Sequence, residues 1–84
     1  MMNMWIECEG NKWVNTRFIL TLSYDDLHKT VNITDINNDV SVIYRNPTMQ
    51  KHDADGIIRC ISVLKINTPS LSQGELYSRI ERFT

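Results

Sequence analysis

The sequence predicts an α+β fold in which a small, mostly antiparallel sheet of four or five strands packs against one C-terminal helix. Three observations support this prediction. Apolar and polar residues alternate through much of residues 4–44, an apolar run occupies residues 57–66, and a helix-start signal follows Pro69. Because the chain has 84 residues and no linker-like segment, we expect a single domain over residues 1–84.

Two segments with period-two alternation, residues 4–9 and 14–22, flank the turn pair Gly10-Asn11 and predict a β-hairpin. The register follows from the side-chain pattern, because a slip of one residue moves every side chain to the opposite face of the sheet. A two-residue loop mixes apolar and charged groups on one face. A three-residue loop over residues 10–12 keeps one face apolar, so we predict the three-residue loop.

In this register Cys8 pairs with Val14 on the apolar face, whereas the opposite face carries Trp5 and Trp13 together with Arg17. Exposed aromatic residues beside an arginine are common anchors of protein interfaces, and they also serve as stacking platforms for single-stranded nucleic acid. The same side chains can instead be covered by another layer of the chain itself. We predict that Trp5, Trp13 and Arg17 are the partner-binding residues.

The middle of the chain predicts further strands joined by polar segments. Residues 23–29 fit either one helical turn or a continued strand and loop, and residues 31–33 indicate a short strand. Residues 40–44 alternate as another strand, and residues 57–66 have a charge-free alternating face that we interpret as a strand of the same sheet. The polar segments are interpreted as a turn over residues 35–39 and a loop over residues 47–56.

The C-terminal helix has the clearest local signals. Ser72 followed three residues later by Glu75 is a capping box, and Leu71 with Leu76 forms a hydrophobic staple across it. These signals predict a helix over residues 73–83. Because so short a helix is marginal alone, we expect it to dock on the sheet or on a partner.

Composition excludes several classes of protein. With 42% hydrophobic and 23% charged residues, the composition is that of a folded globular domain, and a net charge of −1 does not by itself suggest strong nonspecific binding to nucleic acid. Residues 1–42 hold six acids and three bases (net −3), whereas residues 43–84 hold four acids and six bases (net +2), which allows a mildly basic face. No signal peptide or membrane-spanning run is visible, so we expect a cytoplasmic protein that does not bind membranes.

Side chains that support catalysis or metal binding are few. Two polar segments, residues 25–28 and 52–55, combine histidine with aspartate and supply metal ligands only if they converge, so we interpret both as solvated loops. Cys8 and Cys60 lack metal-ligand spacing, and we expect two buried, reduced thiols. The chain has no serine-nucleophile or phosphate-loop motif. We therefore predict a non-enzyme with no metal and no cofactor.

These observations favour a small, non-enzymatic regulatory protein that occludes or bridges a protein partner, as an inhibitor or adaptor, and forms a homo-oligomer through unpaired sheet edges. Eight Asn and ten Ile against one Ala are typical of AT-rich coding sequences and suggest a phage origin. One alternative is an RNA or single-stranded DNA binding protein that also uses Tyr44, Arg45, Arg79 and Arg82. A second alternative is a small metal-dependent hydrolase, which requires the two histidine segments to meet.

Overall fold

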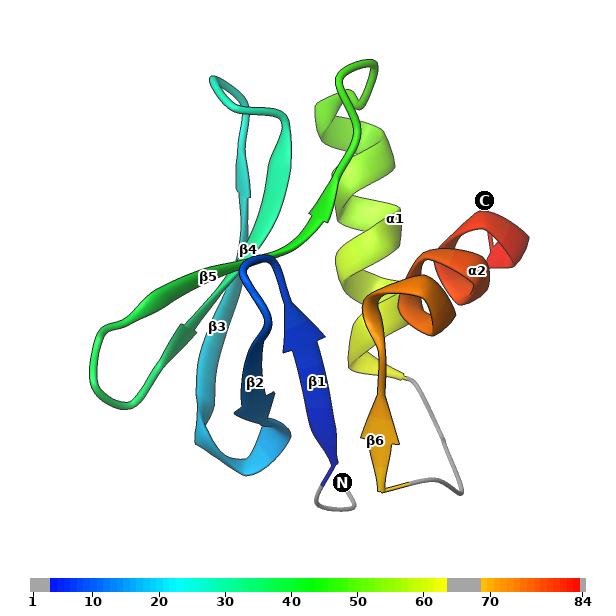
Figure 1. The fold of residues 1–84 in the computed structure, drawn as a ribbon. Helices are drawn as coiled ribbons and strands as arrows, with labels where there is room; N and C mark the ends of the chain where they lie inside the picture. The colour runs from blue at the N-terminus through cyan, green and yellow to red at the C-terminus, as the bar shows by residue number, and fades with distance from the viewer. Residues whose placement is uncertain (1–3, 64–68, 84) are drawn as a thin grey trace.

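A computed structural model describes residues 4–63 and 69–83 of the chain (Figure 1). Over these residues the protein has an α+β fold made of two three-stranded sheets, ordered β2-β1-β6 and β3-β4-β5, and two α-helices. Its elements are β1 (Trp5–Cys8), β2 (Lys12–Asn15), the 3-10 turn η1 (Thr16–Phe18), β3 (Ile19–Asp25), β4 (Thr30–Asp35), β5 (Val40–Arg45), α1 (Lys51–Ser62), β6 (Ser70–Leu71) and α2 (Gln73–Phe83).

The α+β class is confirmed, but the predicted single sheet with one helix is corrected to two sheets with two helices. The extra helix is α1, which occupies part of the predicted loop over residues 47–56 and the first part of the predicted strand over residues 57–66. Its buried positions include Ala54, Ile57 and Ile61, which follow a helical period of three and four residues. A short apolar run is compatible with a strand or a buried helix, and residues 64–66 lie outside the described residues.

The β1–β2 hairpin has the predicted three-residue loop, one position earlier than expected. Ile6 pairs with Val14 and Cys8 with Lys12, so the loop comprises residues 9–11 rather than 10–12. Because the register differs from the prediction by two residues, the two faces keep the predicted side chains. Gly10 and Asn11 supply the positive φ angles of the turn, at 80° and 59°.

The predicted strand over residues 14–22 is interrupted by η1. The Asn15 side chain accepts a hydrogen bond from the backbone N–H of Arg17 at 3.0 Å, and the backbone N–H of Thr16 donates to the carbonyl oxygen of Met4 at 2.8 Å. The Thr16 bond continues the pairing of the hairpin, whereas the Asn15 side chain caps η1, which ends β2 and leads the chain to β3 in the second sheet. The alternation of apolar and polar residues over residues 14–22 therefore covers parts of two strands, β2 and β3, with η1 between them.

The β3-β4-β5 sheet is an antiparallel meander with two carboxylate-stabilised turns. Asp25 Oδ1 accepts from the backbone N–H groups of Leu27 and His28, and Lys29 closes the turn with a φ of 56°. Residues 23–29 are thus a continued strand and turn, rather than one helical turn. The predicted turn over residues 35–39 and the strand that follows it are confirmed.

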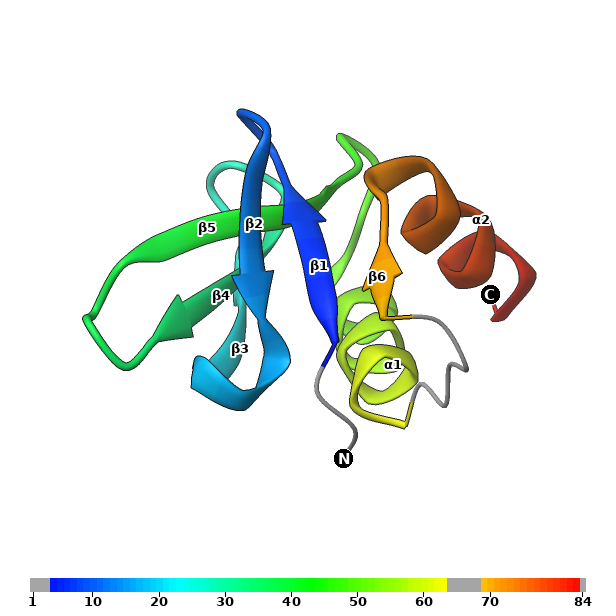
Figure 2. The same ribbon diagram turned by 60° about the horizontal axis from the view of Figure 1, so that its bottom comes forward.

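The helix α2 matches its predicted range and cap. The Glu75 backbone N–H donates to Ser72 Oγ at 3.3 Å, and Ser72 Oγ donates to Glu75 Oε1 at 2.9 Å. In Figure 2, β1 and β6 lie between β2 and α2. The largest fully buried side chains include Ile6, Ile33, Ile43, Met49, Leu71, Leu76 and Ile80. Neither described helix has the length and apolar character needed to span a membrane.

Candidate functional site

A hollow of about 210 Å³ lies beside β2 and combines the two tryptophans with two further apolar side chains. Trp5, Trp13, Phe18 and Ile36 line it and are 46%, 43%, 40% and 53% exposed, and we call it the aromatic hollow. The remaining lining residues are Lys12, Val14, Asn15, Asp35 and Asn37. Other large apolar side chains, Leu20, Leu27, Val40 and Val63, are at least as exposed, but none of them lines this hollow.

The aromatic hollow is built by the hairpin register and by two turns. Trp5 lies opposite Asn15, and Trp13 lies opposite Glu7, so both tryptophans project from the outer face of the hairpin. The backbone N–H of Ile36 donates to the carbonyl oxygen of Phe18 at 2.9 Å, which joins η1 to the β4–β5 turn. This bond brings Phe18 and Ile36 together beside the tryptophans although they are distant in sequence.

Arg17 is not one of the residues that line the aromatic hollow, but it lies against one of them, Phe18. Its guanidinium carbon is 5.3 Å from the centre of the Phe18 ring, a cation–π distance, and its side chain is exposed. Among the lining residues, Lys12 adds a positive charge and Asp35 a negative one. Asp35 Oδ1 already accepts the backbone N–H groups of Asn37 and Asp39. The structure thus places the three predicted partner-binding residues in one region.

Sequence reasoning missed Phe18 and Ile36. The predicted hairpin register, in which Cys8 pairs with Val14, puts Phe18 on the apolar face of the strand over residues 14–22, and Ile36 falls within the predicted polar turn over residues 35–39. The available signal was Asn15-Thr16, a pair whose side chains readily bond to nearby backbone and end a strand. If the strand is taken to end at this pair, the alternation no longer assigns Phe18 to the apolar face.

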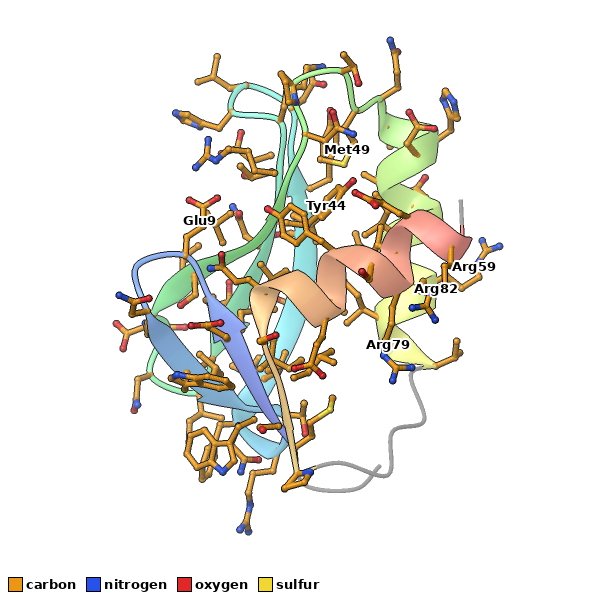
Figure 3. The ribbon with its side chains drawn as sticks, turned by 45° about the vertical axis from the view of Figure 1, so that its right-hand side comes forward. Glu9, Tyr44, Met49, Arg59, Arg79 and Arg82 are labelled. Atoms are coloured by element: carbon orange, nitrogen blue, oxygen red, sulfur yellow. The ribbon has the colours of Figure 1, made fainter. Side chains whose placement is uncertain are left out.

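Tyr44 and Arg45, which the nucleic-acid alternative assigned to ligand contacts, serve the fold in this structure. Tyr44 is only 6% exposed, and its ring lies 4.7 Å from that of Tyr77, so it presents no open face for a base. Arg45 donates to both carboxylate oxygens of Glu9 at 2.9 and 3.0 Å, and this pairing holds the pKa of Glu9 below its ordinary value. Tyr77, which covers Tyr44, belongs to α2, the helix that also carries Arg79 and Arg82 (Figure 3).

The two histidine segments each bond locally. His28 Nδ1 lies 2.8 Å from Asp25 Oδ2 in the β3–β4 turn, and His52 Nε2 lies 3.2 Å from Asp53 Oδ1 at the start of α1. Within the part of the chain that the structure describes, no three His, Cys, Asp or Glu side chains gather as ligands of one metal ion. This arrangement gives no support to the hydrolase alternative.

Both cysteines are free and buried, as predicted. Burial raises the pKa of the Cys8 thiol to about 11 and raises the pKa of the Cys60 thiol as well. A thiol of this kind stays protonated at neutral pH and is a poor nucleophile. The two sulfurs therefore act as small apolar groups of the interior.

Comparison with protein-family models, curated proteins and solved structures finds no match for this chain. The interpretation of the aromatic hollow accordingly rests on its own geometry. Its side chains offer apolar contact area, aromatic ring faces and nearby charges, and groups of these kinds contact binding partners.

Proposed function

We propose that this protein is a small, non-enzymatic regulatory protein that occludes or bridges a protein partner, and that the aromatic hollow is its binding surface. The observation that carries the proposal is the gathering of Trp5, Trp13, Phe18 and Ile36, all half-exposed, around a single hollow. Tryptophan dominates the energetics of protein interfaces because it buries a large apolar area with few rotatable bonds. A folded chain gains nothing from leaving such a cluster in water.

The charged side chains at and beside the aromatic hollow indicate which chemical groups a partner would present. Lys12 and Arg17 bring positive charge to the aromatic hollow, whereas Asp35 is already engaged by backbone N–H groups of its own turn. A partner that presents one large apolar side chain next to a carboxylate complements both features. The apolar group fills the hollow, and the carboxylate meets Arg17 or Lys12.

A homo-oligomer is a further part of the proposal. β2 and β3 are edge strands of their sheets, so each carries a row of backbone groups that another strand can pair. β2 also borders the aromatic hollow. Pairing of two copies along β2 would place two aromatic hollows close together and suit a bridging role.

The test is recovery of the tagged protein from its own cells with nuclease present, followed by identification of the proteins that accompany it. Wild type and Leu27→Ser should recover the same discrete partner, because Leu27 is 85% exposed in the distant β3–β4 turn. Trp13→Ala and Ile36→Ser should lose it, with an affinity drop of at least about 30-fold for an anchor residue.

Two outcomes contradict the proposal. One is that Trp13→Ala and Ile36→Ser, both confirmed as folded by circular dichroism, keep the partner as well as Leu27→Ser does. The other is that no discrete protein accompanies wild type once nuclease is present. Sedimentation velocity of the purified protein tests the homo-oligomer, and a monomer at all concentrations rejects that part alone.

A further inference from the structure

Three arginines from two neighbouring helices share one side of the molecule. Arg59 lies in the last turn of α1, and Arg79 and Arg82 lie one turn apart near the end of α2. The helices pack against each other, and Figure 3 shows the three labelled side chains on the same side of the pair. Arg59 and Arg82 are exposed, and Arg79 is half-buried. We call these residues the arginine face.

The position of the arginine face is set by the core. Ile57 and Ile61 of α1 and Leu76 and Ile80 of α2 are buried, so each helix turns its apolar side inward and leaves its arginines outside. Arg79 is close enough to Cys60 of α1 for its charge to lower the pKa of that thiol, against the larger effect of burial.

Carboxylates are also close in sequence, because Asp55 precedes Arg59 by four residues on α1 and Glu81 lies between Arg79 and Arg82 on α2. Among the residues that the structure describes, none of the three guanidinium groups forms an ion pair, whereas Arg45 is paired with Glu9. Glu75 precedes Arg79 by four residues, but it bonds to Ser72 at the helix cap. A chain with a net charge of −1 thus concentrates three available cations in one place.

We propose that the arginine face binds the phosphate groups of a nucleic acid. The guanidinium group offers a planar fork of N–H donors that matches the oxygens of a phosphate, and three such groups on two helices suit a chain of repeated phosphates. A membrane surface fits less well, because the apolar sides of both helices are buried in the core and cannot enter lipid. This site is separate from the aromatic hollow and goes beyond the proposed protein binding.

The proposal predicts a particular mode of binding. The tryptophans lie on the hairpin, with β1 and β6 between β2 and the helix α2 (Figure 2), so they are not placed to stack bases of a strand held by the arginines. Contacts to phosphates alone bind without sequence preference and weaken steeply with salt. For three phosphate contacts, the slope of log K against log salt is about −2 for a single strand and about −3 for B-form DNA.

The experiment measures fluorescence anisotropy of labelled oligouridine, oligodeoxythymidine and a mixed-sequence DNA duplex, at low salt and across a salt series. The test variant is R59Q/R79Q/R82Q. The matched control is K29Q/R45Q/K51Q, which removes three positive charges that lie outside both the arginine face and the aromatic hollow. The test variant should lose at least about tenfold in affinity and most of its salt slope, while the control stays within about twofold of wild type.

Because Arg79 is half-buried, R59Q/R82Q provides a second test on exposed positions and should lose about two thirds of the salt slope. The proposal is overturned if wild type binds none of the three nucleic acids at low salt, or if both triple variants weaken binding equally. It is also overturned if only the control loses affinity, or if wild type binds vesicles with anionic lipid but no nucleic acid. Trp13→Ala should retain nucleic-acid binding, which separates this test from that of the aromatic hollow.

Discussion

The two sides of the β2-β1-β6 sheet are closed in different ways. On the β6 side, α2 packs directly against the sheet, and Leu71, Leu76 and Ile80 are fully buried. On the β2 side, η1 and the β4–β5 turn come close, and Trp13 and Ile36 remain half-exposed around a hollow. Apolar side chains on the β6 side are therefore buried and stabilise the fold. Apolar side chains on the β2 side stay partly in water, and covering them would be favourable.

Polar groups follow the same division. On the α2 side, Glu7 Oε1 accepts the backbone N–H of Gln73 at 3.1 Å, and Glu9 pairs with Arg45. The backbone N–H of Arg45 in turn donates to the hydroxyl of Tyr77 at 2.9 Å. These contacts tie the hairpin, β5 and α2 together. Beside the aromatic hollow, Asp35 accepts only backbone N–H groups of its own turn, and Arg17 lies over the neighbouring Phe18 ring.

The largest expected effect is a difference in the free energy of unfolding between two variants, one with a truncated side chain on the β6 side of the sheet and one with a truncated side chain on the β2 side. Leu76→Ala should lower the free energy of unfolding by about 2–5 kcal/mol, because a fully buried side chain leaves a cavity. Ile36→Ala should lower it by less than about 1 kcal/mol, since the side chain is 53% exposed. Urea denaturation followed by circular dichroism measures both. Equal losses would show that the aromatic hollow is part of the core.

A second, smaller effect concerns Cys8, which lies on the core face of β1 between the two sides. Burial raises its pKa from 9.0 to about 11, so the unfolded chain releases the thiol proton at a lower pH than the folded chain does. Stability should therefore be complete below pH 9 and fall as pH rises towards 11, by about 2–3 kcal/mol at most.

Urea denaturation at a series of alkaline pH values measures this decline. The pKa values of Tyr24 and Tyr77 are also raised, so part of the decline belongs to them. Cys8→Ala should make the decline shallower, although it lowers stability at neutral pH by creating a cavity. An unchanged decline in Cys8→Ala would mean that the thiol reaches water in the folded protein.

The smallest effect is expected at the ion pair that joins the hairpin to β5. Glu9→Gln should cost about 0.2–1 kcal/mol, because both side chains are partly exposed and water screens the attraction. Arg45 lowers the folded pKa of Glu9, so this contribution is present above the ordinary carboxyl pKa of about 4.3 and is lost as pH falls through the lowered value.

Denaturation of wild type and Glu9→Gln at low and high salt isolates this pair. Their difference should shrink at high salt and vanish in acid. Asp55→Asn, an exposed carboxylate on α1, serves as the control and should cost less than Glu9→Gln at neutral pH. A larger cost for Asp55→Asn would show that the junction between the hairpin and β5 is not held by this pair.

Several features could be predicted because their causes are local. The capping box of Ser72 and Glu75 encodes the start of α2, and the Asx-rich turn after Asp35 joins β4 to β5. Alternation in the hairpin predicted Trp5 and Trp13 on the outer face. This prediction holds although the observed register differs by two residues, because a shift of two residues leaves every side chain on the same face. Each signal lies within a few residues of the structure that it specifies.

Other features depend on contacts between distant segments. Residues 57–62 form a helix rather than a strand because Ile57 and Ile61 find a buried surface that suits a helical period, and nothing in the run itself makes that choice. Tyr44 is buried because Tyr77 of α2 packs against it, and Arg45 is held by Glu9 of the hairpin turn. Phe18 meets Ile36 through one backbone bond between two turns.

The sequence by itself therefore determined the α+β class, the C-terminal helix, the hairpin faces and the two tryptophans as candidates for binding. Only the tertiary structure decided that a second helix replaces the central strand, that Phe18 and Ile36 complete the aromatic hollow, and that Arg59 joins Arg79 and Arg82. The physical reason is the range of the interactions. Capping, turn geometry and alternation act between near neighbours, whereas burial and surface clustering depend on which distant segments the core brings together.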